Sequence, residues 1–272
     1  MIRIGMSTSC VFPRPLESAF RTAREAGFDG VEVMVSAEAA TRSAASMLGM
    51  TRRYELPVLA IHAPVLFFTQ FVWGTDQRGK LQRSAELAAE VGAPTVVVHP
   101  PFRWQAGYAE RFLDIVREIA ADTGVEIAVE NMFPWRVSGR PLRAYMPGID
   151  PVEMDCDAIT LDFSHAALAG QDALEMARAA GERLRHVHLC DGQAPPTPEG
   201  REGDGRMFDE HLVPGRGGQP VAETLRHLAG TGWRGSVVAE VNTRRARGEA
   251  GRLELLWETL DFARTHLAGA AP

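Results

Sequence analysis

The sequence predicts a (β/α)8 barrel, and three observations support this prediction: a regular repeat, a matching length and the lack of a competing motif. Short runs rich in β-branched residues recur about every 25 to 35 residues, separated by stretches with helical spacing of apolar residues. Eight such runs within 272 residues have the length and rhythm of this fold. A doubly wound open sheet is the alternative. It normally carries a glycine-rich phosphate loop after its first strand, and STSCVFPRP is not such a loop.

The expected strands follow these runs in order. In a barrel of this class each is a short parallel strand buried on both faces, which explains its apolar, β-branched composition. The runs are IRIGMS (2–7), GVEVMVS (30–36), PVLAIHA (57–63), TVVVHP (95–100), EIAVEN (126–131), ITLDFSH (159–165), RHVHLCD (185–191) and GSVVAEV (235–241).

The expected helices lie between the strands and are rich in Ala, Leu, Arg and Glu. Several end in glycine, the residue usually found just past a helix C-terminus. Examples are the stretches 16–27, 76–92 and 111–124, which end in Gly27, Gly92 and Gly124; Gly181 ends another.

Composition favours one large domain over residues 1–272, because 45% hydrophobic content supports a single full core. The chain has no run of roughly 18 to 20 apolar residues that could span a bilayer, and its first residues resemble a strand rather than a signal peptide. Cys10, Cys156 and Cys190 are too few and too scattered for a disulfide framework. We therefore expect a cytoplasmic protein.

The charge of the chain argues against nucleic acid as a partner. The formal net charge is −6, so no general attraction to a phosphate backbone exists and binding would need a local basic patch. A small molecule is the expected substrate, and a homo-oligomer stays open.

Alternation along the strands identifies polar groups that should face the barrel interior. In 126–131 the apolar Ile127 and Val129 face the helices, which turns Glu130 inward at the carboxyl end, where barrel enzymes place catalytic groups. The same alternation turns further residues inward at the same rim: Asp162, His188, Glu240, His62 and His99.

Several carboxylates in one buried pocket would repel each other and take up protons unless a cation balanced them. We therefore interpret Glu130, Asp162, His188 and Glu240 as ligands of a divalent metal ion. For His62 and His99, contact with metal or substrate and simple packing remain open. His186, one layer lower, is interpreted as a hydrogen-bonded core residue. The pairs Asp162/His165, with His165 in the loop after the strand, and Asp209/His211 are weak signals by themselves.

A family resemblance emerges from these motifs taken together. AGFDG followed by VEVMVS, then IHAP, VVVHP, AVEN, LDFSH, HVHLCD, DEHLVPGRG and VVAEV, resembles the sugar phosphate isomerase/epimerase family of xylose isomerase-like TIM barrels, which also includes endonuclease IV. These motifs span residues 27 to 241, nearly the whole expected barrel.

The resemblance implies a metal-dependent isomerase or epimerase of a sugar, or of a sugar-like polyol or keto compound. The common metal site of the family maps onto Glu130, Asp162, His188 and Glu240, with Mn2+, Mg2+, Co2+ or Zn2+ as the ion. One of Glu130 and Glu240 would remove a proton beside the carbonyl, the other would return one, and His188 would orient the substrate oxygen. This reaction passes through a metal-stabilised cis-enediolate.

The endonuclease IV branch gives the principal alternative, a zinc phosphodiesterase acting on abasic DNA. That branch binds three zinc ions and adds five ligands, and matching residues are present here: His62, His99, His165, Asp209 and His211. The opening strand and DNA-recognition loops of that branch have no clear counterpart in this sequence. A lyase or hydrolase using the same metal site, and a barrel that only binds a metabolite, are further alternatives.

Two loop features complete the prediction. The Gly/Pro-rich segment from Asp191 to Arg206 is expected to act as a lid. Aromatic residues in three other loops either pack a lid or subunit contact or form a wall for a substrate less polar than a free sugar: Phe67, Phe68, Phe71, Trp73, Trp104, Phe133 and Trp135.

Overall fold

The structure is a computed structural model, and it describes residues 2–65, 69, 71–137, 140–194 and 209–268. Most of the expected lid, as well as Phe67 and Phe68, therefore lies outside the described residues.

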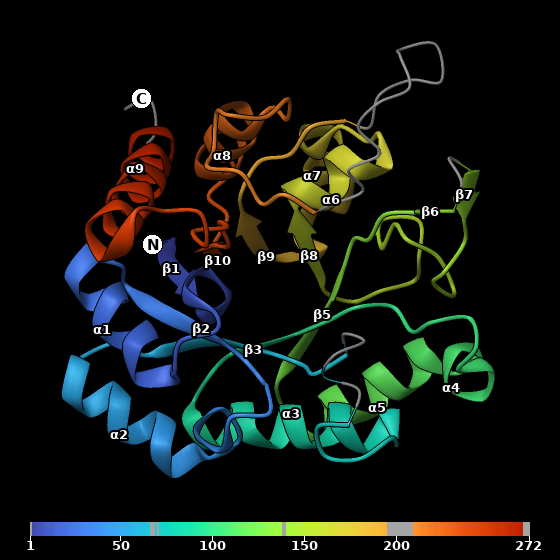
Figure 1. Cartoon of the computed structure of the whole chain (residues 1–272). Coiled ribbons are helices and arrows are strands. Elements are labelled where there is room, and N and C mark those ends of the chain that lie inside the picture. The colour runs from blue at the N-terminus through green and yellow to red at the C-terminus, as the bar shows by residue number, and fades with distance from the viewer. Residues whose placement is uncertain (1, 66–68, 70, 138–139, 195–208, 269–272) are drawn as a thin grey trace.

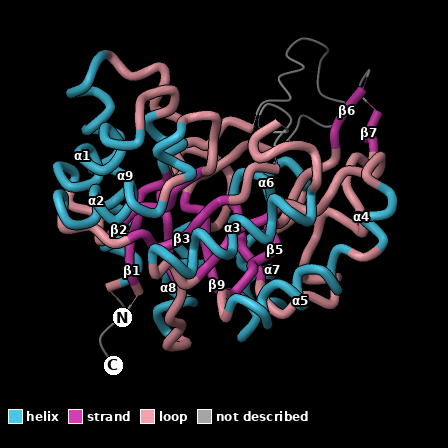
Figure 2. Tube along the Cα trace, turned by 90° about the horizontal axis from the view of Figure 1, so that it is seen from below, coloured by secondary structure: helices cyan, strands magenta, loops and turns pink. Residues whose placement is uncertain are grey.

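Within the described chain, eight parallel strands close into a barrel, which confirms the predicted fold class and excludes the open sheet. The strand order around the barrel is β1-β10-β9-β8-β5-β4-β3-β2. Figure 2 shows these strands at the centre of the molecule with helices around them. Their bounds are β1 (Arg3–Ser7), β2 (Gly30–Met34), β3 (Val58–His62), β4 (Thr95–Val98), β5 (Glu126–Glu130), β8 (Ile159–Asp162), β9 (Leu184–Leu189) and β10 (Ser236–Ala239).

The helices connect successive strands and cover their outer faces (Figure 1). Gly27, Gly92 and Gly124 adopt the left-handed conformation that ends a helix, as predicted. The α-helices are α1 (Leu16–Ala26), α2 (Ala44–Tyr54), α3 (Gln77–Val91), α4 (Ala106–Glu110), α5 (Phe112–Thr123), α6 (Phe163–Ala169), α7 (Ala173–Ala180), α8 (Val221–Gly230) and α9 (Gly248–Leu267). Short 3-10 helices are η1 (Thr8–Val11), η2 (Ala39–Arg42) and η4 (Gly181–Arg183).

The expected strand over 159–165 is too long, because the chain turns into helix α6 after Asp162. Asp162 caps this helix: its Oδ1 accepts a hydrogen bond of 2.8 Å from the backbone N–H of His165. His165 therefore lies in the first turn of a helix, and its prediction as a loop residue was wrong. The hairpin of β6 (Trp135–Val137) and β7 (Arg140–Leu142) was not predicted, and in Figure 1 it lies at the edge of the molecule.

Toward the amino-terminal ends of the strands, which we call the lower end of the barrel, apolar side chains fill the interior. Gly5 on β1 and Gly30 on β2 leave the room that Leu59 occupies: an added Cβ would lie 2.7 Å from Leu59 Cδ1 at Gly5 and 2.6 Å from Leu59 Cγ at Gly30. Such an overlap would force the strands apart. The polar residues of the site lie above this apolar floor, toward the carboxyl ends of the strands.

The three cysteines are buried and free of disulfide bonds. Among the described residues, no helix is both long enough and apolar enough to cross a membrane.

Candidate metal centre

Four strand ends bring Glu130, Asp162, His188 and Glu240 together at the carboxyl end of the barrel. Glu130 and Asp162 are the last residues of β5 and β8, His188 lies on β9, and Glu240 directly follows β10. All four residues are at most 4% exposed. One ligand atom from each lies within 4.8 Å of those from the other three.

The ring nitrogen Nδ1 of His188 is at the centre of this group. It lies 2.9 Å from Glu130 Oε1, 2.9 Å from Glu240 Oε2 and 3.6 Å from Asp162 Oδ2. Metal–ligand bonds of about 2.1 Å place neighbouring ligand atoms about 3.0 Å apart in an octahedral site. The chemistry and spacing of these donors therefore fit a single small divalent ion.

Glu130 also joins three further histidines to this group. Its Oε2 lies 3.0 Å from His99 Nε2 and 3.4 Å from His62 Nε2, while its Oε1 lies 3.3 Å from His165 Nδ1. All three histidines are buried. For His62 and His99 the sequence left contact with metal or substrate and simple packing open, and it gave His165 as an additional candidate contact; the structure brings each of them against Glu130.

Asp209 and His211, which come from the segment after β9, complete a second group beside Asp162. Asp209 Oδ2 lies 2.9 Å from both His165 Nε2 and His211 Nε2, and His211 Nε2 lies 3.7 Å from Asp162 Oδ2. The position of this segment is fixed by Asp191, whose carboxylate accepts backbone N–H bonds from Gly192, Gly215, Gly217 and Gln219.

The group is charged before any metal binds. Burial opposes ionisation of the carboxylates, but the neighbouring histidines, His188 first, hold the pKa of Glu130 well below its ordinary value and lower the pKa of Glu240 to about 2. Burial likewise opposes protonation of the histidines. For His188 and His211 the nearby carboxylates outweigh the effect of burial. They raise the pKa of His188 well above its ordinary value and the pKa of His211 to about 9.

These shifts predict how the stability of the metal-free protein depends on pH. A histidine whose pKa rises from 6.5 to about 9 on folding, as for His211, stabilises the fold fully below pH 6.5 and loses this effect as pH approaches 9. Glu240, lowered from 4.5 to about 2, stabilises the fold above pH 4.5 and loses this effect as pH falls toward 2. The free energy of unfolding should therefore be highest between these limits and fall by roughly 3 kcal/mol toward pH 9.

Urea denaturation in the presence of EDTA at a series of pH values measures this profile. His211→Gln should flatten its alkaline side. An unfolding free energy of the wild type that rises steadily from pH 6.5 to 9 would contradict the assigned ion pairs.

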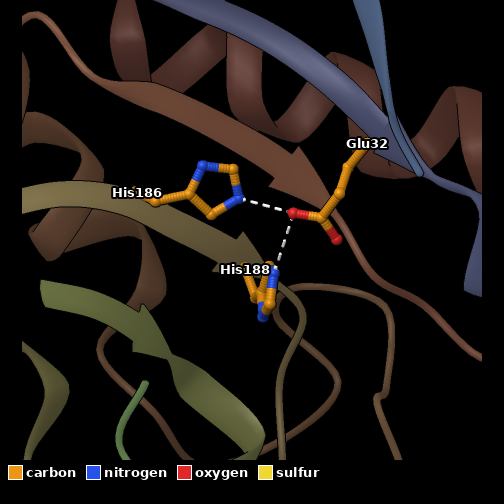
Figure 3. Close-up of side chains that lie close together, drawn as sticks. All are labelled: Glu32, His186 and His188. Carbon is orange, nitrogen blue, oxygen red and sulfur yellow. Dashed lines mark hydrogen bonds and ion pairs between the residues drawn. The ribbon is translucent and has the colours of Figure 1, made fainter. Parts of the chain in front are cut away.

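Sequence reasoning did not identify Glu32, although it is fully buried beneath the four-residue group. On β2 the flanking Val31 and Val33 belong to the apolar core outside the barrel, so Glu32 points into the interior. Its Oε2 contacts Nε2 of both His186 and His188, as Figure 3 shows. The alternation that identified Glu130 would also have identified Glu32, but it was followed only in the runs from 57–63 onward and not in the run 30–36.

The site opens into a cavity of about 430 Å³. Phe133 and Trp135, two of the aromatic residues considered as a substrate wall, line it together with Phe102 and Tyr145, while Glu130 and Glu240 form part of its polar side. Residues not predicted from the sequence also line it, including Ser9, Asn242 and Arg244. Trp104 stacks on Phe102 with ring centroids 4.5 Å apart but does not line the cavity.

Comparison with known proteins gives consistent results. The family model described as xylose isomerase-like TIM barrel matches residues 20–265. An uncharacterised protein of Mycobacterium tuberculosis is 45% identical over 285 residues, covering 98% of both chains. Fructoselysine 3-epimerase of Escherichia coli O157:H7 is 20% identical, covering 89% of this chain and 91% of the relative.

Solved structures agree at the level of the fold. A D-tagatose 3-epimerase-like protein superposes with a TM-score of 0.66 at 24% identity, covering 97% of this chain and 99% of the other. The 3-keto-D-glucoside 4-epimerase of Escherichia coli superposes with a TM-score of 0.69 at 21% identity, covering 97% of this chain and 100% of the other.

Proposed function

This chain belongs to the xylose isomerase-like TIM barrel family, and on that basis we propose that it is a divalent-metal-dependent isomerase or epimerase of a sugar-like carbonyl compound. The observation that carries the proposal is the pair Glu130 and Glu240, each 2.9 Å from His188 Nδ1 and each lining the cavity. Removal of a proton and its return require two acid–base groups at the reacting carbon. Two carboxylates that line one cavity and belong to a candidate metal site meet this requirement. Epimerases among the relatives and structural neighbours support the same reaction class.

Glu130, Asp162, His188 and Glu240 would hold the ion. Their carboxylate-rich set suits Mn2+, Mg2+ or Co2+, and the histidine also allows Zn2+. When bound, such an ion polarises the substrate carbonyl and stabilises the negative charge of a cis-enediolate.

The residues of the chain supply the proton chemistry. One of Glu130 and Glu240 removes the proton beside the carbonyl and the other returns a proton to the opposite face or to the neighbouring carbon. His188 is fully buried and does not line the cavity, so it would orient the substrate oxygen through the ion that it helps to hold. Phe133 and Trp135 on the apolar side of the cavity exclude water from the reacting carbon.

Deuterium exchange tests this reaction directly. If Glu130 and Glu240 exchange protons with solvent, substrate turned over in D2O should gain up to one deuterium at the carbon beside the carbonyl, as measured by mass spectrometry and NMR. The assay uses a panel of free ketohexoses and 3-keto glycosides with Mn2+-loaded protein, and metal-stripped protein as control. A compound that is converted while this C–H remains fully protiated would rule out solvent-exchanging proton transfer and favour a hydride shift or hydrolysis.

A second candidate function rests on one further observation. Asp209 bridges His165 and His211 at 2.9 Å each, and His62 and His99 both contact Glu130, so the donor set exceeds what one ion needs. A phosphodiesterase with up to three zinc ions would use such a set.

Elemental analysis of the purified protein separates the two candidates, because the isomerase requires one tightly bound ion per chain and the phosphodiesterase three. We expect one ion, and no cleavage of an abasic-site duplex at physiological salt, given the net charge of −6. Three ions per chain with strand cleavage that is lost in His211→Ala would reverse the ranking.

The remaining features of the proposal concern the setting of the enzyme. We infer a single domain over residues 1–272, a small carbohydrate-like substrate and a cytoplasmic location, and the three free cysteines support a reducing compartment. A homo-oligomer is compatible with the structure.

A further inference from the structure

A buried cluster lies one layer below the candidate metal centre. It comprises Glu32 on β2 and His186 and His188 on β9, all with 0% exposed surface. Strands β1 and β10 separate β2 from β9 around the barrel, so Glu32 reaches His188 through the barrel interior. Glu32 Oε2 lies 2.8 Å from His186 Nε2 and 3.2 Å from His188 Nε2 (Figure 3).

The contact defines which nitrogen of His188 keeps its proton when the other gives up its own to bind a cation. A single carboxylate oxygen, Glu32 Oε2, lies within hydrogen-bonding distance of Nε2 of both His186 and His188. An oxygen placed between two ring nitrogens is the acceptor for both, so Nε2 of His188 is the donor. In a neutral imidazole the other nitrogen then has the free lone pair. This nitrogen, Nδ1, is the one that faces Glu130, Glu240 and Asp162.

A purely structural role explains Glu32 poorly. A fully buried carboxylate is costly, and apolar residues of similar volume usually stabilise a core at least as well. Glu32 Oε1 has no hydrogen-bond partner in the described part of the chain, so the burial cost is only partly compensated. What the carboxylate does provide is a fixed acceptor behind the ring of His188.

We propose that Glu32 is a positioning residue, which fixes the tautomer and ring orientation of His188 so that Nδ1 presents its lone pair to a divalent cation, while His186 holds Glu32 in place. The inference rests on the proposed metal site. It adds to that site a residue that does not touch the ion, because His188 lies between them. Carboxylates behind metal-bound histidines in other proteins act in this way.

Glu32→Gln tests the proposal with little change of shape. The glutamine amide can donate to Nε2 of a histidine, which would favour the tautomer with the proton on Nδ1, where the cation should bind. We expect the dissociation constant for Mn2+, measured by calorimetry and by the EPR signal of free Mn2+, to rise 10- to 100-fold. The number of ions bound at saturation should not change, and the visible spectrum of the Co2+ form should shift.

Thr160→Val is the matched control. Thr160 pairs with His186 across β8 and β9, is fully buried and has no side-chain hydrogen bond in the described structure. It should bind Mn2+ like the wild type. Glu32→Asp, which keeps the charge but withdraws it from His188, serves if Glu32→Gln does not fold, and it should weaken Mn2+ binding in the same direction.

The outcomes separate failure of this inference from failure of the metal site. If the wild type binds Mn2+ and folded Glu32→Gln binds it equally well, Glu32 is structural and the inference is wrong, while the metal site stands. If Glu32→Gln binds one ion fewer at saturation, Glu32 is itself a ligand, which also overturns the inference. If the wild type binds no Mn2+, Co2+ or Zn2+, the metal site is rejected and the role of Glu32 with it.

Discussion

Glu240→Gln should lower kcat by at least about 10³-fold while leaving the fold intact. The substitution keeps the shape of the side chain but removes a carboxylate that lies 2.9 Å from His188 Nδ1 and lines the cavity. A carboxamide can neither accept the substrate proton at neutral pH nor contribute negative charge to the site. Binding of Mn2+ should therefore weaken as well, by about 100-fold or more, a larger effect than expected for Glu32→Gln.

The matched control for this variant is Glu126→Gln. Glu126 begins β5, the strand that ends at Glu130, but it is exposed at the opposite end of the barrel, where it pairs with Arg185. Kinetics and circular dichroism of both variants decide the assignment. If Glu240→Gln retains more than a tenth of wild-type kcat, Glu240 is not a proton-transfer group.

Removal of the metal should abolish turnover and lower the thermal unfolding temperature. An ion present at about 1,000 times its dissociation constant stabilises the folded state by about 4 kcal/mol, which corresponds to roughly 8 to 16 °C for a chain of this size. The physical reason is that the carboxyl groups of Glu130, Asp162 and Glu240 lie close together and lose the compensating charge of the ion. In the metal-free state the neighbouring histidines His188 and His211, whose pKa values the carboxylates raise, partly balance these charges.

Calorimetry before and after EDTA treatment, with Mn2+ added back as the control, measures this effect. Elemental analysis must first show that the metal has been removed. If protein verified to be metal-free keeps its activity and its unfolding temperature, the ion contributes neither to catalysis nor to stability.

The sequence was sufficient to predict the barrel, because parallel strands buried on both faces have an apolar, β-branched composition that repeats along the chain. It was also sufficient to select Glu130, Asp162, His188 and Glu240 for the site, since side-chain alternation within a strand is a local property. Their convergence in the structure agrees with that selection, and their role as ligands stays a prediction for the experiments above to test.

Other features depend on contacts that are distant in sequence. Asp209 meets His165 because the described residues that follow Asp209, Leu212 to Gly217, are tied to Asp191. The residues next to Asp209 and His165 in the sequence do not indicate this contact. The early start of α6 depends on whether Asp162 caps a helix or continues a strand, and the sequence LDFSH permits both. Glu32 was missed for a different reason, because the alternation was not followed in the run 30–36, which ends in the apolar and small residues Met34, Val35 and Ser36.

The apolar floor formed by Leu59 between Gly5 and Gly30 has a kinetic consequence. The layer above it, which contains Glu32 and His186, has no exposed surface, so the described barrel gives no route to the site from below. In the described part of the chain, the cavity beside Glu130 and Glu240 gives an opening to the site, and ion, substrate and product would pass through it. A substrate occupying that opening would block the departure of any ion beneath it, so binding should be ordered, with the ion first on and last off.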